Sequence, residues 1–194
     1  MVEAWFSRND QAVLAANVFF GSQYAESPSV DVRFLFAVFS TEAYHRSLGT
    51  GLYMNQDDYA KAVESLASQI PPAIQSDHRR SLVNRLKYGN EWSLRKRLTE
   101  MLNRVPGDVQ RGIAGDVEQF VKKVVDTRNY LTHYDQSAKA NAFSGMDMYV
   151  ASQRIRILVI ANLLKDLGLD DSRLLKVLKR SAEFNHWMAQ NLPL

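Results

Sequence analysis

Apolar residues recur along most of this chain at the three- and four-residue spacing of helices. Between residues 9 and 24, Leu14 and Val18 are four residues apart, which places them on one face of a helix. Residues 30–48 are apolar nearly all round the helix, and helices of that kind are normally buried. No segment alternates like a strand bounded by hairpin turns. The pattern therefore predicts an all-α fold in which residues 30–48 form a central helix.

Capping residues and helix breakers divide the chain into segments. Asn55 and Asp58 have the spacing of a helix N-cap and its first turn, and Pro71 and Pro72 end that helix near residue 70. The other helices are expected at residues 9–24, 30–48, 76–88, 91–103, 108–131 (with interruptions near Gly112 and Gly115), 144–167 and 170–191.

The composition is that of an ordinary globular protein, because 46% of the residues are apolar and 23% are charged. The chain has no cysteine, which excludes disulfides and thiolate nucleophiles, and its four histidines do not have the spacing of a zinc motif. Its N-terminus does not resemble a signal peptide, and its apolar runs are far shorter than the roughly 20 residues of a bilayer span. We therefore expect a soluble, cytoplasmic protein without a membrane partner, a metal or another cofactor.

Basic residues are concentrated between residues 79 and 104, although the net charge of the whole chain is only +3. That stretch holds eight basic and two acidic residues, with Tyr88 and Trp92 among them. One interpretation is an RNA-binding surface, in which cations contact phosphates and rings stack on bases. The other is a solvated helix face with extended basic side chains. The first interpretation assigns RNA contacts to Arg79, Arg80, Arg85, Lys87, Arg95, Lys96 and Arg97.

The most specific motif is R-N-x-x-x-H, formed by Arg128, Asn129 and His133 within the letters DTRNYLTHYD. A histidine can move a proton near neutral pH, and an arginine can hold a phosphate and its transition-state charge with a planar fork of donors. On an ideal helix Arg128 and His133 point about 140° apart, so they are not expected to touch within one chain. The structural alternative is an arginine paired with Asp126 or Asp135, and a histidine placed at a helix C-terminus.

These letters resemble the HEPN superfamily of helical ribonucleases, and most closely its ApeA-like branch of bacterial anti-phage defence proteins. The resemblance implies an up-and-down helical bundle, with core helices at 9–24, 30–48, 116–133, 144–167 and 170–191 and a helical insertion at about 50–106. It also implies a two-fold dimer in which two R-N-x-x-x-H motifs compose one active site. Such bundles commonly end longer polypeptides, so residues 1–194 are interpreted as one HEPN-like domain, either stand-alone or the C-terminal part of a longer protein.

Two further residues are candidates for supporting the motif. Glu42 lies in the most apolar predicted helix, where a charge needs a partner. Its carboxylate either orients Arg128 or His133, or pairs structurally with a nearby arginine such as Arg46. Tyr134, which follows the motif histidine directly, is assigned a supporting role as well.

A second arginine–histidine pair shows that spacing alone is weak evidence. Arg180 and His186 are six residues apart, and in one continuous helix their side chains would diverge by about 240°. No asparagine follows Arg180. We expect a surface arginine and a half-buried histidine beside Trp187.

Two functions of different classes remain open. The first is a metal-independent RNA endonuclease, a toxin-like effector of phage defence through abortive infection, which is active as a homodimer. The second is a non-catalytic HEPN-like module that dimerises, binds a partner or nucleotide, and regulates an attached domain. RNA and a second copy are the expected partners of the first, and an antitoxin or a fused sensor domain is a further candidate. The intact Arg128, Asn129 and His133 favour the endonuclease.

Overall fold

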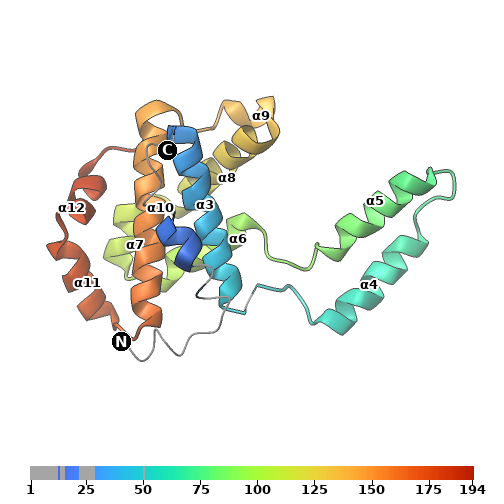
Figure 1. Ribbon diagram of the computed structural model, residues 1–194, viewed down its shortest axis with the longest axis horizontal. Coiled ribbons are helices and arrows are strands. Elements are labelled where there is room, and N and C mark those ends of the chain that lie inside the picture. Colours follow the sequence, from blue (N-terminus) through green and yellow to red (C-terminus); the bar gives the residue numbers. More distant parts are fainter. Residues whose placement is uncertain (1–12, 14–15, 22–28, 50) are drawn as a thin grey trace. The chain divides into compact units, whose positions relative to one another are not determined.

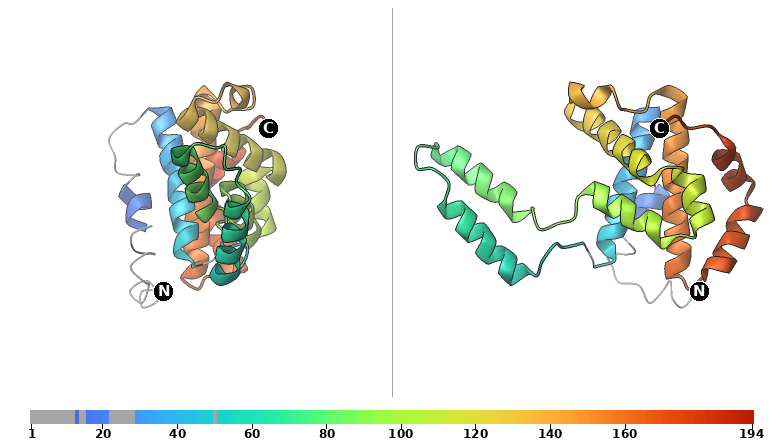
Figure 2. Two further views of the ribbon diagram at one scale, coloured as in Figure 1. Left: turned by 90° about the vertical axis from the view of Figure 1, so that its right-hand side faces the viewer. Right: turned by 180° about the vertical axis from the view of Figure 1, so that it is seen from behind.

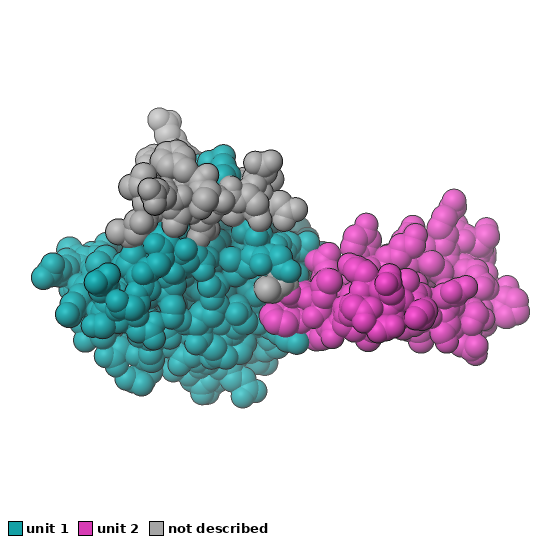
Figure 3. All heavy atoms as spheres, turned by 90° about the horizontal axis from the view of Figure 1, so that it is seen from below, with its two compact units in different colours: residues 1–49, 94–194 teal, residues 50–93 magenta. Residues whose placement is uncertain are grey.

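The computed structural model describes residues 13, 16–21, 29–49 and 51–194. Within these residues every regular element is a helix, apart from one isolated antiparallel bridge between Leu52 and Glu91. The prediction of an all-α fold is thus confirmed. The chain divides into two compact units, which Figure 3 colours separately. We call residues 1–49 and 94–194 the bundle unit, and residues 50–93 the hairpin unit.

The bundle unit is built around α10 (Gly145–Asp166), which lies beside α3 (Val30–Ser47) in Figure 1. Side chains all round α10 are buried, among them Ala151, Ile155 and Leu158. The central helix is therefore α10, and the prediction that residues 30–48 form it is wrong. The helices α6 (Leu94–Arg104), α7 (Gly107–Ala114), α11 (Asp171–Arg180) and α12 (Ala182–Ala189) also contact α10, and α8 (Val117–His133) packs on α3, α6 and α7 (Figure 2).

The helix α3 has one face in the core and one apolar face that stays exposed. Phe34 and Val38 are buried on the inner face. On the outer face, Val32 is 39% exposed, Phe36 42% and Phe39 57%. The all-round apolar pattern of residues 30–48 therefore reflects two different surfaces, of which only one is covered by the residues that the structure describes.

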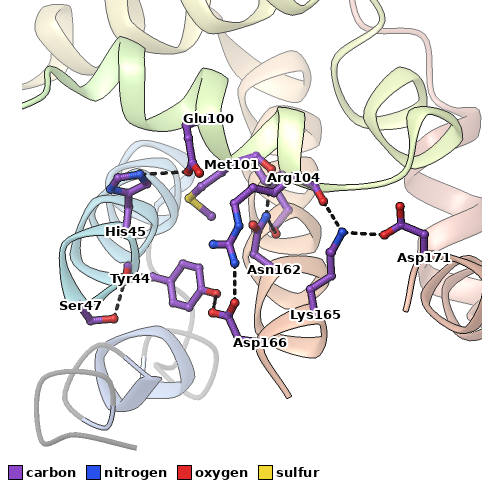
Figure 4. Close-up of polar contacts among 11 residues, drawn as sticks. Tyr44, His45, Ser47, Glu100, Met101, Arg104, Asn162, Lys165, Asp166 and Asp171 are labelled. Carbon is purple, nitrogen blue, oxygen red and sulfur yellow. Dashed lines mark hydrogen bonds and ion pairs between the residues drawn. The ribbon is translucent and has the colours of Figure 1, made fainter. Parts of the chain in front are cut away.

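Buried polar side chains fix α3 against α6 and α10 (Figure 4). The Tyr44 hydroxyl of α3 donates to the Asp166 carboxylate of α10, which also accepts from Arg104 of α6. Asn162 of α10 donates to the Met101 carbonyl oxygen of α6 at 3.2 Å. Because polar groups removed from water need partners, these contacts favour one register of the three helices.

His45 joins the same helices and is fully buried. Its Nδ1 lies 2.9 Å from an Arg97 guanidinium nitrogen, and its Nε2 lies 3.0 Å from a Glu100 carboxylate oxygen. An arginine can only donate, so Nδ1 is the acceptor and Nε2 carries the proton that is donated to Glu100. Burial lowers the pKa of His45; Glu100 opposes this shift, and Arg97 adds to it. We infer that the folded protein holds this ring in its neutral form.

The helix α8, which carries the R-N-x-x-x-H motif, has well-defined ends. Gly115, with a φ of 61°, ends α7, and Asp116 caps α8 by accepting from the Gln119 N–H at 3.0 Å. The predicted interruption near Gly115 is confirmed, whereas the one near Gly112 is wrong, because Gly112 lies inside α7. At the other end Tyr134 adopts a left-handed φ of 52°, so α8 stops directly after His133. The four-residue α9 (Gln136–Lys139) follows.

The C-terminal segment, predicted as one helix at 170–191, consists of the two helices α11 and α12. Ser181 lies between them with extended backbone angles, φ −77° and ψ 120°. Its hydroxyl accepts from the Phe184 N–H at 3.2 Å and so caps α12. The serine therefore starts a new helix where the apolar periodicity alone predicted a continuous one.

The hairpin unit contains α4 (Gln56–Ser68) and α5 (Ser76–Lys87). The predicted cap is present, since the Asn55 side chain accepts from the Asp58 N–H at 2.8 Å. The unit ends at residue 93 rather than near 106. The reason is that α6 belongs to the bundle unit, where Leu98 and Met101 are fully buried.

Two remaining expectations concern the N-terminal helix and the membrane. Of the helix predicted at residues 9–24, residues 13 and 16–21 are helical, and the others lie outside the described residues. Among the helices described, none combines the length and apolar character that a bilayer crossing needs.

Candidate functional site

A cavity of about 520 Å³ lies between α3 and α8 in the bundle unit. Its α8 side carries Arg128, Thr132 and His133, so both charged members of the motif border one space. Its α3 side is apolar except for Glu42. The apolar lining consists of Val32, Leu35, Phe36, Val38 and Phe39.

The Arg128 guanidinium is held from two sides. One of its terminal nitrogens donates to the Asn129 side-chain oxygen at 3.0 Å. The other lies 3.9 Å from a carboxylate oxygen of Glu42. The Arg128 side chain is nevertheless 31% exposed, so part of its donor fork is open to a ligand in the cavity.

Glu42 combines the two roles that the sequence left open. One oxygen of its carboxylate accepts from Arg46 at 3.0 Å, four residues further along α3, and the other faces Arg128. Its side chain is 20% exposed, which reduces the cost of placing a charge in this helix. One carboxylate between two guanidinium groups leaves a net positive charge, which favours binding of an anion such as phosphate.

His133 is the last residue of α8, and its side chain is exposed at the cavity. The described hydrogen bonds and ion pairs of Arg128 go to Asn129 and Glu42, and none joins it to His133. The two side chains thus make no described contact with each other, as the helix geometry predicts, and both border the cavity between α3 and α8. Thr132 turns its hydroxyl back to the Arg128 carbonyl oxygen at 2.7 Å.

The arginine part of the structural alternative is contradicted by the partners of the two aspartates, whereas the histidine part agrees with the structure, because His133 is the last residue of α8. Asp126 pairs with Lys122 at 2.8 Å, not with Arg128. Asp135 accepts from the Ser137 N–H and hydroxyl, and these hydrogen bonds lower the pKa of Asp135, with a smaller contribution from His133. The arginine is therefore free of both carboxylates that would have given it a structural role.

Tyr134 ends α8 through its backbone conformation, and its supporting role in the site stays a prediction. Its side chain is 77% exposed and does not line the cavity between α3 and α8. Its left-handed conformation turns the chain away at the end of α8, which leaves His133 at the helix terminus. A non-glycine residue in this region of φ is uncommon and is often found at functional sites.

Two of the seven predicted RNA-binding residues have structural contacts instead. Arg97 is only 2% exposed and contacts His45, so its assignment to RNA is wrong. Arg79 donates to the carbonyl oxygens of Ala67 and Ile70, which gives it a structural role at the end of α4. The other five are exposed, and for them RNA contact stays a prediction: Arg80, Arg85 and Lys87 of α5, and Arg95 and Lys96 of α6.

The second arginine–histidine pair lies on two different helices. Arg180 ends α11, and His186 lies in α12 beyond the break at Ser181. The His186 ring packs edge-on against Trp187, with 4.5 Å between the ring centroids, as expected. It is exposed, however, and not half-buried.

Sequence reasoning missed the apolar half of the site. Phe36 and Phe39 line the cavity between α3 and α8 and are largely exposed, which is unusual for phenylalanine. The signal was present in the all-round apolarity of residues 30–48, since a helix in the core of a single chain rarely needs a second apolar face.

The comparisons with known proteins give the family of the chain but no individual relative. Neither the curated proteins nor the solved structures contain a match to the chain. Among the described residues there is also no group of three or more histidine or acidic side chains that could hold a metal ion. A family model described as Apea-like HEPN matches residues 36–173, a range that includes Glu42, Arg128, Asn129 and His133. Since this range covers well over half of the sequence, the chain belongs to the Apea-like HEPN family.

Proposed function

We propose that this protein is a metal-independent RNA endonuclease of the HEPN type that acts as a toxin-like effector in phage defence. The observation that carries the proposal is that Arg128 and His133 border one cavity, with the guanidinium held by Asn129 and Glu42. Anchoring of this kind fixes an arginine at the place where charge develops in a transition state. Membership of the Apea-like HEPN family supports the same reaction class.

The active species in this proposal is a two-fold homodimer. The exposed Val32, Phe36 and Phe39 form an apolar stripe on α3 that directly adjoins Arg128 and His133. Contiguous exposed apolar surface of this kind is characteristic of protein interfaces. A second copy seated on the stripe brings its own arginine and histidine to the same place. The composite site then has two bases and two cations, which one copy alone lacks.

The chemistry needs only these groups. An imidazole nitrogen of His133 takes the proton of a ribose 2′-hydroxyl, and the 2′-oxygen attacks the adjacent phosphorus. Arg128 stabilises the negative charge that develops on the phosphoryl oxygens. The bond to the 5′-oxygen breaks, and that oxygen receives a proton from the partner subunit's His133 or from water. The products are a 2′,3′-cyclic phosphate and a 5′-hydroxyl.

The identity of the product ends tests this mechanism. Purified protein incubated with mixed RNA in EDTA is expected to leave 2′,3′-cyclic phosphates, detectable by mass spectrometry of the fragments. DNA of the same sequence should survive, because it lacks the 2′-hydroxyl. Cleavage that requires magnesium, or that proceeds equally on DNA, would contradict the mechanism. Absence of any cleavage would favour the non-catalytic HEPN-like module instead.

Asn129 is expected to matter less than the residue it holds. Asn129→Ala removes one of the two anchors of Arg128 but leaves Glu42 in place, so we expect a loss of activity of about tenfold. The melting temperature should change little, because Asn129 is only half-buried. Asn129→Asp, which keeps an oxygen acceptor for the guanidinium, should recover part of the activity. A collapse of the fold in Asn129→Ala would indicate a structural residue instead.

A further inference from the structure

The hairpin unit has no buried side chain among the described residues of its two helices. The helices α4 and α5 are 13 and 12 residues long, lengths at which isolated helices are marginal and depend on packing. The residues in the seam between them, such as Tyr59, Val63, Leu82 and Leu86, are only half-buried. The hairpin therefore has a half-buried interface between its two helices but no buried core.

The apolar stripe of α4 is wider than one neighbouring helix requires. On a helical wheel the stripe spans about 160° and consists of Tyr59, Ala60, Ala62, Val63, Leu66 and Ala67. Packing against a single helix needs only two apolar positions per heptad. This stripe is open at one edge, where Ala60 is exposed, and at Leu66, which is 54% exposed and lies about 120° from Ala60 on the wheel. Ala60 and Ala67 lie about 20° apart, and small residues at that edge allow another helix to approach closely.

The two helices carry opposite charge. α4 has three acidic residues and one lysine, and its Asp57 and Glu64 lie seven residues apart along the edge of the stripe beside Ala60. α5 has four cations, Arg79, Arg80, Arg85 and Lys87, against Asp77 alone. A hairpin with one acidic and one basic helix is electrostatically complementary to a second copy of itself.

We propose that the hairpin unit is a self-association module, in which the hairpins of two copies pair into a four-helix bundle. Around this bundle the helices alternate, so that each α4 lies between its own α5 and the α5 of the second copy. Every neighbouring pair is then antiparallel and opposite in charge, and the half-buried seam becomes a core. This contact is independent of the nuclease site.

Charge reversal separates this contact from any contact made by the bundle unit. In the acidic variant, Arg80→Glu with Lys87→Glu, seven residues apart on one edge of α5, makes both helices acidic, and in the basic variant, Asp57→Lys with Glu64→Lys makes both basic. Each variant alone should associate with itself about tenfold more weakly than the unmodified protein, because like charges then face each other. When the two are mixed, native mass spectrometry should find more mixed than unmixed dimers, beyond random exchange.

A matched control reverses the same number of charges away from the hairpin. Arg173→Glu with Lys176→Glu changes two exposed cations of α11 in the bundle unit. This variant should mix randomly with the basic variant. The excess of mixed dimers seen with the acidic variant should also decrease at high salt.

Cross-linking locates the contact. The chain has no cysteine, so Ala60→Cys introduces a single thiol at the exposed edge of the stripe, beside Asp57 and Glu64. A short bis-maleimide should link two Ala60→Cys copies efficiently. It should link two Lys61→Cys copies poorly, because Lys61 is 78% exposed on the opposite side of α4.

Random mixing of the acidic and basic variants, or equal cross-linking at positions 60 and 61, would overturn the proposal. So would an acidic variant that mixes randomly but loses affinity for RNA, since the basic helix α5 would then be an RNA-binding surface. Variants of His133 should mix and cross-link like the unmodified protein, because His133 lies in the bundle unit. A failure of the nuclease proposal is therefore distinguishable from a failure of this one.

Discussion

His133→Ala and Arg128→Ala are each expected to lower the rate of RNA cleavage by at least about a hundredfold. The histidine is the group placed to accept the 2′-hydroxyl proton, and the arginine is the anchored cation at the same cavity. Arg128→Lys should lose nearly as much, because an ammonium group keeps the charge but not the planar fork of donors. The double variant should be little worse than either single one, since the groups act as a unit.

The matched controls for these substitutions lie in the same chain. Arg180→Ala and His186→Ala remove the second arginine–histidine pair, which is distributed over α11 and α12, and should leave cleavage unchanged. The melting temperature of His133→Ala should stay close to that of the unmodified protein, because the side chain is exposed. Cleavage that persists in His133→Ala would exclude this histidine as the base.

Features that depend on neighbouring letters could be predicted from the sequence. The N-cap at Asn55 and the break near Gly115 follow from capping and turn preferences that act within a few residues. The motif itself depends on six consecutive positions of one helix. Local interactions are sufficient to predict such elements, because the interacting residues lie within one or two helical turns of each other.

Features that depend on distant partners could not be predicted. Nothing near Arg97 indicates that its guanidinium is buried against His45, which lies 52 residues away. The same holds for the inclusion of α6 in the bundle unit, where Leu98 and Met101 are buried. Glu42 is the clearest example, because the sequence could not decide whether its partner is Arg46 or a residue of the motif. In the structure its carboxylate faces both Arg46 and Arg128.

At micromolar concentration, Phe39→Asp is expected to break the dimer contact that α3 makes with a second copy. It is also expected to abolish RNA cleavage. A carboxylate in the centre of an apolar interface is costly, so the dissociation constant of this contact should rise by more than about a hundredfold. Phe39 is 57% exposed within one chain, so the same substitution should leave the fold of the monomer intact, as circular dichroism and thermal melting can check. Phe36→Ser should act in the same direction and more weakly.

The control for an introduced charge is Val177→Asp, which alters a residue of α11 that is 48% exposed but lies away from the cavity between α3 and α8. It should change neither the mass in sedimentation experiments nor the cleavage rate. Loss of activity in Phe39→Asp without a change in the α3 contact would mean that the phenylalanine contacts RNA. A Phe39→Asp monomer that still cleaves at the full rate would show that one Arg128 and one His133 suffice. Only parallel loss of assembly and activity supports a site built from two copies, in which the exposed face of α3 is apolar because another α3 covers it.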